Sequence, residues 1–178
     1  MIITETEAIR QSISHSVQAM GIFTQCSVKI VEIEIEFHEN EIKKPFKNSH
    51  EHIVYSILMG DIVGESYLLM SDICLNKLSD KLFGIGNQIS DLFKKEMLKE
   101  LDNIVTAATI SKLCNYTDSE CSAYVPELLD TDFDGIFDYM SKSINTFVPC
   151  FFVDSIIELQ DLNEQIEFKW VIKWAEND

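Results

Sequence analysis

The sequence has no long apolar run and few basic residues. No apolar stretch approaches the ~20 residues that a membrane-spanning helix needs, so no span is predicted. Only 14 of the 178 residues are Lys or Arg, against 30 Asp or Glu, and the formal net charge is −16. This charge argues against binding to nucleic acid or to an anionic membrane surface, because both require Lys and Arg to neutralise phosphates.

The chain also lacks a G-x-S-x-G motif, a P-loop and a dinucleotide-binding fingerprint. Acyl-enzyme, nucleotide and hydride chemistry therefore have no support in the sequence. The cysteines are odd in number and show no C-x-x-C spacing: Cys26, Cys74, Cys114, Cys121 and Cys150. They are expected to be buried free thiols, and the N-terminus has acids where a secretory signal has bases. We expect a cytoplasmic protein.

Residues 1–178 are predicted to form a single α+β domain, a largely antiparallel six-stranded sheet with packed helices. A helical pattern of apolar residues precedes Gly21, which is expected to end the helix. Residues 29–38 alternate strictly, and four apolar residues are expected on one face: Val31, Ile33, Ile35 and Phe37. Five more strands are expected near 53–60, 64–70, 121–128, 150–160 and 165–175.

The longest helical pattern lies around residues 94–113, with Ser90 as a candidate cap. Its predicted apolar stripe consists of Phe93, Met97, Leu101, Ile104 and Ala108, widened by Leu98 and Val105. Glu96, Glu100, Asn103 and Ala107 share the neighbouring stripe. Residues three apart are neighbours on a helix, so Glu100 and Asn103 can reach one small target together. Alone, this E-x-x-N pattern is typical of an ordinary solvated helix face.

The surrounding sequence gives the pattern more weight. The run from Glu100 to Leu113 resembles the signature helix of the CheC/CheX family of response-regulator phosphatases, which carries E-x-x-N followed by small residues and a later Leu. Upstream, residues 56–70 resemble that family's strand–turn–strand unit, and a helix ending at Gly84 follows, as in the family. The resemblance covers residues 53–128, and it lies in the ordered combination of elements.

The resemblance implies that the substrate is the aspartyl phosphate of a CheY-type receiver domain. Asn103 would position the attacking water, because a neutral carboxamide donates and accepts hydrogen bonds without adding charge beside the phosphate. Glu100 would pair with a lysine next to the receiver's phosphoryl group. Glu96 and Ala107 are expected to contact this partner. No metal or cofactor of the chain's own is implied, because the receiver would bind the Mg²⁺.

The resemblance is closer to the CheX branch of the family. The CheC branch carries a second such helix, whereas residues 131–145 here contain no E-x-x-N, so one site per chain is expected. CheX-type relatives form homodimers, which implies a homodimer for this chain.

One departure from the family pattern keeps a different function open. Ala107 and Ala108 stand where family members usually have Gly and Asn. The alternative is a non-catalytic adaptor that binds a receiver domain, or a flagellar-switch-type partner, through the same helix. A third possibility is a structural interaction domain whose strand edges pair.

Two further clusters resemble metal sites. Asp130, Asp132 and Asp134 match the first half of a calcium-binding EF-hand loop, but Ser141 occupies the position of the bidentate Glu. The sequence favours acids at a helix N-terminus and leaves open whether they bind a cation. His50 and His52, with His38 upstream, are interpreted as exposed loop side chains, because a metal pair would need further ligands at a defined distance.

Overall fold

The strands form one antiparallel sheet in the computed structural model, which describes residues 4–42, 50–84, 89–129, 138 and 141–175. Within these residues the sheet has seven strands in the order β1-β6-β7-β3-β2-β4, and β5 also pairs with β2. They are β1 Val28–His38, β2 His52–Gly60, β3 Ile62–Met70, β4 Cys121–Ala123, β5 Glu127–Leu129, β6 Cys150–Leu159 and β7 Glu164–Trp174. The predicted α+β class and antiparallel sheet are confirmed.

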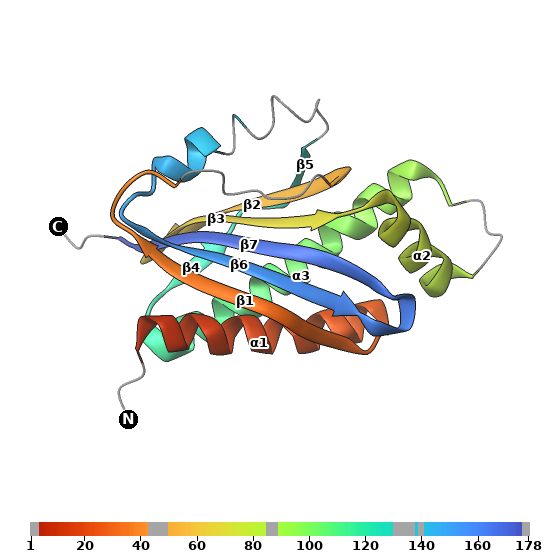
Figure 1. Cartoon of the computed structure of the whole chain (residues 1–178), viewed down its shortest axis with the longest axis horizontal. Helices are drawn as coiled ribbons and strands as arrows, with labels where there is room; N and C mark the ends of the chain where they lie inside the picture. The colour runs from red at the N-terminus through yellow and green to blue at the C-terminus, as the bar shows by residue number, and fades with distance from the viewer. Residues whose placement is uncertain (1–3, 43–49, 85–88, 130–137, 139–140, 176–178) are drawn as a thin grey trace.

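The long helices lie on one side of this sheet (Figure 1). They are α1 Glu5–Thr24, α2 Asp72–Phe83 and α3 Asp91–Thr117. Helix α1 packs along α3, and the two cross the sheet together. Ser90 begins α3 as predicted, because its side chain accepts a hydrogen bond from the Phe93 amide at 3.3 Å. No helix among the described residues is both long and apolar enough to cross a membrane.

The main hydrophobic core lies between the helices and the sheet. Trp170 and Phe168 of β7 are among its largest side chains, and they contact each other edge to face at 5.6 Å between ring centroids. A second cluster, which includes Tyr67 and Val171, lies on the opposite face of the sheet and is covered partly by residues 141–145. Each strand of the sheet centre therefore buries side chains on both faces.

The expected end of the first helix is wrong. Helix α1 continues through Gly21 to Thr24, and Gln25 adopts the left-handed conformation that ends it. The glycine serves close packing instead, because a Cβ at Gly21 would lie 3.3 Å from the Cys26 carbonyl oxygen.

The predicted faces of the first strand are also partly wrong. A β-bulge between Ile30 and Glu32 shifts the register of β1 against β6. Ile33 and Ile35 pack against the core as expected, but Val31 is 50% exposed. Phe37 is 54% exposed at the rim of the sheet. A strict two-residue alternation in the sequence cannot reveal an inserted residue.

The six strands of the prediction become seven because the expected strand at 121–128 is split into β4 and β5. Pro126 lies between them and has no N–H to donate to a ladder. Both pieces pair with β2, so the chain follows one sheet edge with an interruption at residues 124–126. This interruption places a short connector beside α3 (Figure 1).

Candidate active site

Helix α3 is held on the sheet by polar contacts as well as by its apolar side. The Ser56 hydroxyl of β2 donates to Asp102 Oδ2 at 2.7 Å, and the Ser66 and Thr106 hydroxyls lie 3.1 Å apart. Ser56 and Ser66 are cross-strand partners in the β2–β3 pair. We call this group of four side chains the buried polar contact. It fixes the rotation of α3, because Asp102 and Thr106 must face the sheet.

Asp102 is fully buried, and its Oδ1 atom has no hydrogen-bond partner among the described residues. Burial raises the pKa of its carboxyl group from 3.8 to about 7, although hydrogen bonds with Ser56 and Thr106 act in the opposite direction. The Asp102 carboxyl group, on the side of α3 that faces the sheet, therefore changes its protonation near neutral pH. No sequence pattern indicates this, since Asp102 looks like one more acid in a charged segment.

The opposite side of α3 presents the predicted stripe. Glu100 and Asn103 are both exposed, and no hydrogen bond or ion pair joins either side chain to another described residue. Ala107 is exposed on the next turn. Glu96 is exposed too, but it already forms an ion pair with Lys99 at 2.6 Å. The acid and the amide are thus available to another molecule, whereas Glu96 is partly neutralised within the chain.

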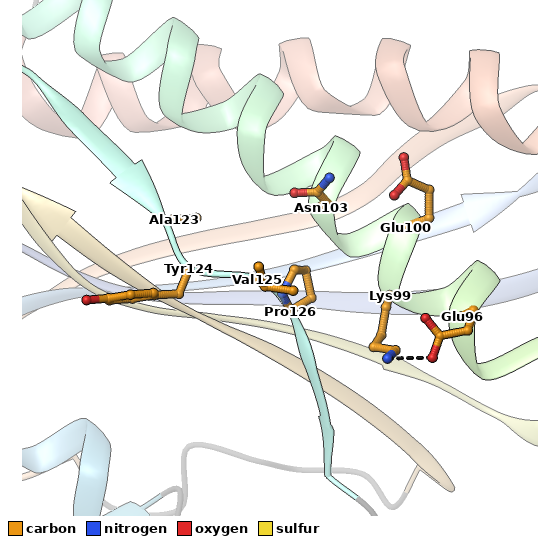
Figure 2. A pocket seen from close by; sticks show the side chains of 8 residues that line it. All are labelled: Glu96, Lys99, Glu100, Asn103, Ala123, Tyr124, Val125 and Pro126. Atoms are coloured by element: carbon orange, nitrogen blue, oxygen red, sulfur yellow. Dashed lines mark ion pairs between the residues drawn. The ribbon is translucent and has the colours of Figure 1, made fainter. Parts of the chain in front are cut away.

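A hollow of about 230 Å³ lies beside this stripe. Figure 2 shows Glu100 and Asn103 on successive turns of α3, with the β4–β5 connector crossing next to them. The lining residues are Glu96, Lys99, Glu100 and Asn103 from α3, Ala123 from the end of β4, and Tyr124, Val125 and Pro126 from the connector. The hollow is open on one side, which suits a group carried on the surface of another protein.

Hydrogen bonds to β2 and to the β2–β3 turn hold the segment that leads into the connector. The Glu120 amide donates to Asp61 Oδ2 and the Asp61 amide donates to the Glu120 carbonyl, both at 2.8 Å. Gly60 makes this approach possible, since its φ is +117° and a Cβ there would lie 2.3 Å from the Glu120 oxygen. Further along, the Tyr124 amide donates to the Ile57 carbonyl at 2.8 Å. These hydrogen bonds determine where the connector lies relative to β2.

The buried side of α3 is rotated slightly from the predicted stripe. Phe93 is 49% exposed and contacts Phe83 edge to face at 5.0 Å between ring centroids. Ile104 and Ala108 are half-buried, while Thr109 and the polar Asp102 are buried. Apolarity alone misplaced the centre of the stripe, because hydroxyl groups on the sheet allow polar residues to face inward.

Sequence reasoning missed Pro126 and Lys99 as parts of the site. Pro126, within the segment predicted as a strand at 121–128, is buried in the wall of the hollow. Lys99 was overlooked because one basic residue in an acidic helix resembles ordinary charge pairing. No local pattern links Pro126 to Asn103; the pairing of β4 and β5 with β2 brings them together.

Solved structures match this chain along nearly its whole length. CheX from Desulfovibrio desulfuricans matches with a TM-score of 0.66 at 7% identity, covering 94% of this chain and 99% of its own. CheX from Borrelia burgdorferi, in a complex with CheY, BeF₃ and Mg²⁺, matches with a TM-score of 0.64 at 15% identity, covering 96% and 99%. A CheC-like superfamily protein from Shewanella sp. PV-4 matches with a TM-score of 0.64 at 10% identity, covering 93% of this chain and 97% of its own. This is the CheC/CheX fold.

The CheC/CheX fold confirms the family resemblance found in the sequence at the level of architecture. No protein-family model and no curated protein sequence matches the chain. This chain thus has the CheC/CheX fold although its sequence is only 7 to 15% identical to those of the three structures above.

The other candidate sites have different outcomes. His50 and His52 were expected to be exposed, but their side chains are only 13% and 16% exposed, and each contacts a carboxylate. The described part of the chain contains no group of three or more His, Cys, Asp or Glu side chains that could hold a metal. Asp130, Asp132 and Asp134 lie outside the described residues. All five cysteines are free; Cys114 and Cys121 are only half-buried.

Proposed function

We propose that this chain is a protein phosphatase that hydrolyses the aspartyl phosphate of a CheY-type response regulator. The observation that supports it best is that Glu100 and Asn103 are exposed beside an open hollow on a CheC/CheX fold, with no hydrogen bond or ion pair to another described residue. A structural neighbour, CheX from Borrelia burgdorferi, was solved with CheY, BeF₃ and Mg²⁺. An acyl phosphate is already reactive, so its hydrolysis requires mainly a well-placed water.

In this mechanism Asn103 orients the attacking water. The carboxamide oxygen accepts a hydrogen bond from the water while the phosphoryl group sits at the mouth of the hollow. The water oxygen forms a bond to phosphorus as the bond between phosphorus and the aspartyl oxygen breaks. The products are the aspartate carboxylate of the receiver and inorganic phosphate, which keeps both protons of the water. Mg²⁺ bound by the receiver neutralises charge on the phosphoryl oxygens, so this chain supplies no metal.

Glu100 binds the receiver and stays away from the phosphate, since two negative groups repel each other. Its carboxylate is exposed and has no cationic partner among the described residues, so it is available to a lysine of the receiver. Desolvation of such a pair at an interface strengthens it, and a close pair is worth a few kcal/mol. Glu96 and Ala107 extend this contact along the same side of α3.

Phosphate release tests the proposal directly. Receiver domains from the same genome are phosphorylated with acetyl phosphate, freed of the donor, and mixed with the purified chain. We expect at least one receiver to lose its phosphate faster than it does alone, with inorganic phosphate appearing in equal amount. If every receiver keeps its intrinsic rate, the chain is not a phosphatase.

The second candidate is a non-catalytic adaptor that binds a receiver domain or a flagellar-switch-type partner. Ala107 and Ala108 favour it, because they replace the Gly and Asn that the resemblance leads one to expect. An adaptor would bind a receiver through Glu100 without accelerating phosphate release. Measuring binding and release on the same receiver separates the two functions.

The proposal includes a homodimer in the cytoplasm, where receiver domains act. Strand β1 is the sheet edge opposite β4, and among the described residues it pairs only with β6. Val31 and Phe37 on this strand are half-exposed. A two-fold pairing of β1 strands would cover this edge and leave α3 free. Light scattering on the wild type and on Val31→Lys tests it: we expect a dimer and a monomer, respectively.

A further inference from the structure

Two large apolar side chains stand exposed beside the candidate active site. Tyr124 is 55% exposed and Val125 is 82% exposed, both on the connector that lines the hollow of Asn103. Ile57 of β2, 40% exposed, lies next to them. Single exposed apolar residues are common on protein surfaces, but a contiguous group at the edge of a functional site requires an explanation.

These residues also line a second hollow, of about 260 Å³. Its lining consists of Tyr55, Ile57, Tyr124, Val125 and Glu127. Tyr124 and Val125 belong to both hollows, so they form a ridge between the apolar one and the one that contains Asn103. Figure 2 shows the Tyr124 ring and the Val125 side chain on the connector next to α3.

The second hollow is preformed. The Tyr124 amide is bonded to the Ile57 carbonyl at 2.8 Å, and the Tyr55 hydroxyl donates to Glu127 Oε2 at 3.1 Å. Pro126 is buried behind the ridge. A rigid apolar surface loses little conformational entropy when a partner binds, which makes it a good anchor point.

Charge around the ridge indicates the kind of partner. Glu100 and Glu127 flank it, and the nearby Lys99 is already paired with Glu96. The whole chain has a formal net charge of −16. A partner that fits this surface combines basic residues with a projecting apolar side chain. Under the proposed function, that partner is the receiver domain whose phosphoryl group faces Asn103.

We propose that Tyr124 and Val125 form the apolar half of the receiver-docking surface, and that the second hollow accepts an apolar side chain from the receiver, next to its phosphorylated aspartate. Glu100 supplies the charged half. The proposal rests on the proposed function for the identity of the partner. It assigns partner selection to the connector, because the Glu–Asn pair would meet a lysine and a phosphoryl group in any phosphorylated receiver.

Binding measurements test this docking surface without requiring catalysis. The probes are the receiver domains of the same genome, each loaded with BeF₃⁻ and Mg²⁺ as a stable mimic of the phosphorylated state. Val125→Glu is compared with Ile22→Glu, a matched control on α1 that is 81% exposed in the wild type. Both positions are open to water, so the added charge leaves folding intact in each.

We expect Val125→Glu to raise the Kd for the best-bound receiver at least tenfold and Val125→Ala to raise it less. Ile22→Glu should stay within twofold of the wild type. An unchanged Kd for Val125→Glu overturns the docking surface even if phosphate release is normal. Loss of self-association by Val125→Glu with an unchanged Kd also overturns it, and assigns the ridge to a second copy of the chain.

The same experiment separates the two proposals. If a receiver binds through Val125 but its phosphate is not released faster, the phosphatase proposal fails and the docking surface stands. If phosphate is released and Val125→Glu changes nothing, the docking surface fails and the phosphatase proposal stands. If no loaded receiver binds the wild type, both fail.

Discussion

Helix α3 has two polar sides that differ in burial and in hydrogen bonding. On one side Asp102 and Thr106 are buried and bonded to serines of the sheet. On the other, Glu100 and Asn103 are exposed and without a partner among the described residues. Asp102 and Asn103 are adjacent in sequence, yet one fixes the helix and the other is free to meet another molecule. Polar character therefore says little about a residue's role until its surroundings are known.

The two sides of α3 also contribute differently to the protein: one stabilises the fold and the other is available to a partner. The buried polar contact stabilises α3 in one rotation, and this rotation determines where Asn103 points. On the exposed side, Glu100 and Asn103 form no hydrogen bond or ion pair with another described residue, and the surface ion pair of Glu96 with Lys99 contributes little to stability. Substitutions on the two sides should consequently affect different measurements.

The largest effect is expected from Asn103→Ala. Removing the carboxamide removes the group that orients water, and we expect the rate of receiver dephosphorylation to fall at least about 100-fold. The unfolding midpoint in urea should stay unchanged, because Asn103 is exposed. Asn115→Ala, also exposed on α3, is the control and should retain full activity. A variant lacking Asn103 that keeps wild-type activity would contradict the assignment.

Substitution of Asp102 on the buried side should change how the unfolding free energy depends on pH. The pKa of Asp102 is about 7 in the folded chain and 3.8 as the ordinary value. The stability contributed by its protonated form is therefore complete below about pH 4, falls as the pH rises, and is lost by about pH 7. The amide that Asp102→Asn introduces does not titrate in this pH range. Relative to the wild type, it should gain about 2 kcal/mol of unfolding free energy between roughly pH 5.5 and pH 8.

Urea unfolding of both proteins at the two pH values measures this difference. The exposed Asp118→Asn is the control and should follow the wild type at both. Asp118 adopts a left-handed conformation at the end of α3, which Asn tolerates well. A constant difference between Asp102→Asn and the wild type would show that the buried carboxyl does not titrate in this range.

Glu100→Gln should weaken docking more than chemistry. The substitution keeps the shape of the side chain and removes its charge, so KM for the phosphorylated receiver should rise about tenfold while kcat changes less. The salt dependence of KM should also become shallower. Glu120→Gln, exposed and outside both hollows, is the charge-matched control. A fall in kcat with a constant KM would instead assign Glu100 to the chemical step.

The smallest effect is expected at Ala107. Ala107→Leu adds an exposed side chain one turn beyond Asn103, and we expect it to raise KM about threefold by obstructing the partner. Stability should change little, because Leu is a good helix former. Ser14→Leu on an exposed part of α1 is the control. No change in KM would place Ala107 outside the contact and remove it from the predicted partner-binding residues.

Several parts of the fold could be predicted because their signals are local. The inward position of Ile33 and Ile35 in β1, the Ser90 cap of α3, and the exposed position of Glu100 and Asn103 follow from periodicity and capping. Other parts depend on contacts that no local pattern encodes. The bulge in β1 depends on an inserted residue, and the burial of Asp102 depends on Ser56, which is distant in sequence.

The sequence by itself determined the class of the fold and the outward position of an acid and an amide three residues apart on a long helix. Helical spacing is a property of the backbone, so it can be read without knowing what surrounds the helix. Only the tertiary structure decided that Asp102 is buried and that the Tyr124–Pro126 connector stands beside Asn103. Both depend on strand pairing, which joins residues far apart in the chain and leaves no periodic trace in either segment.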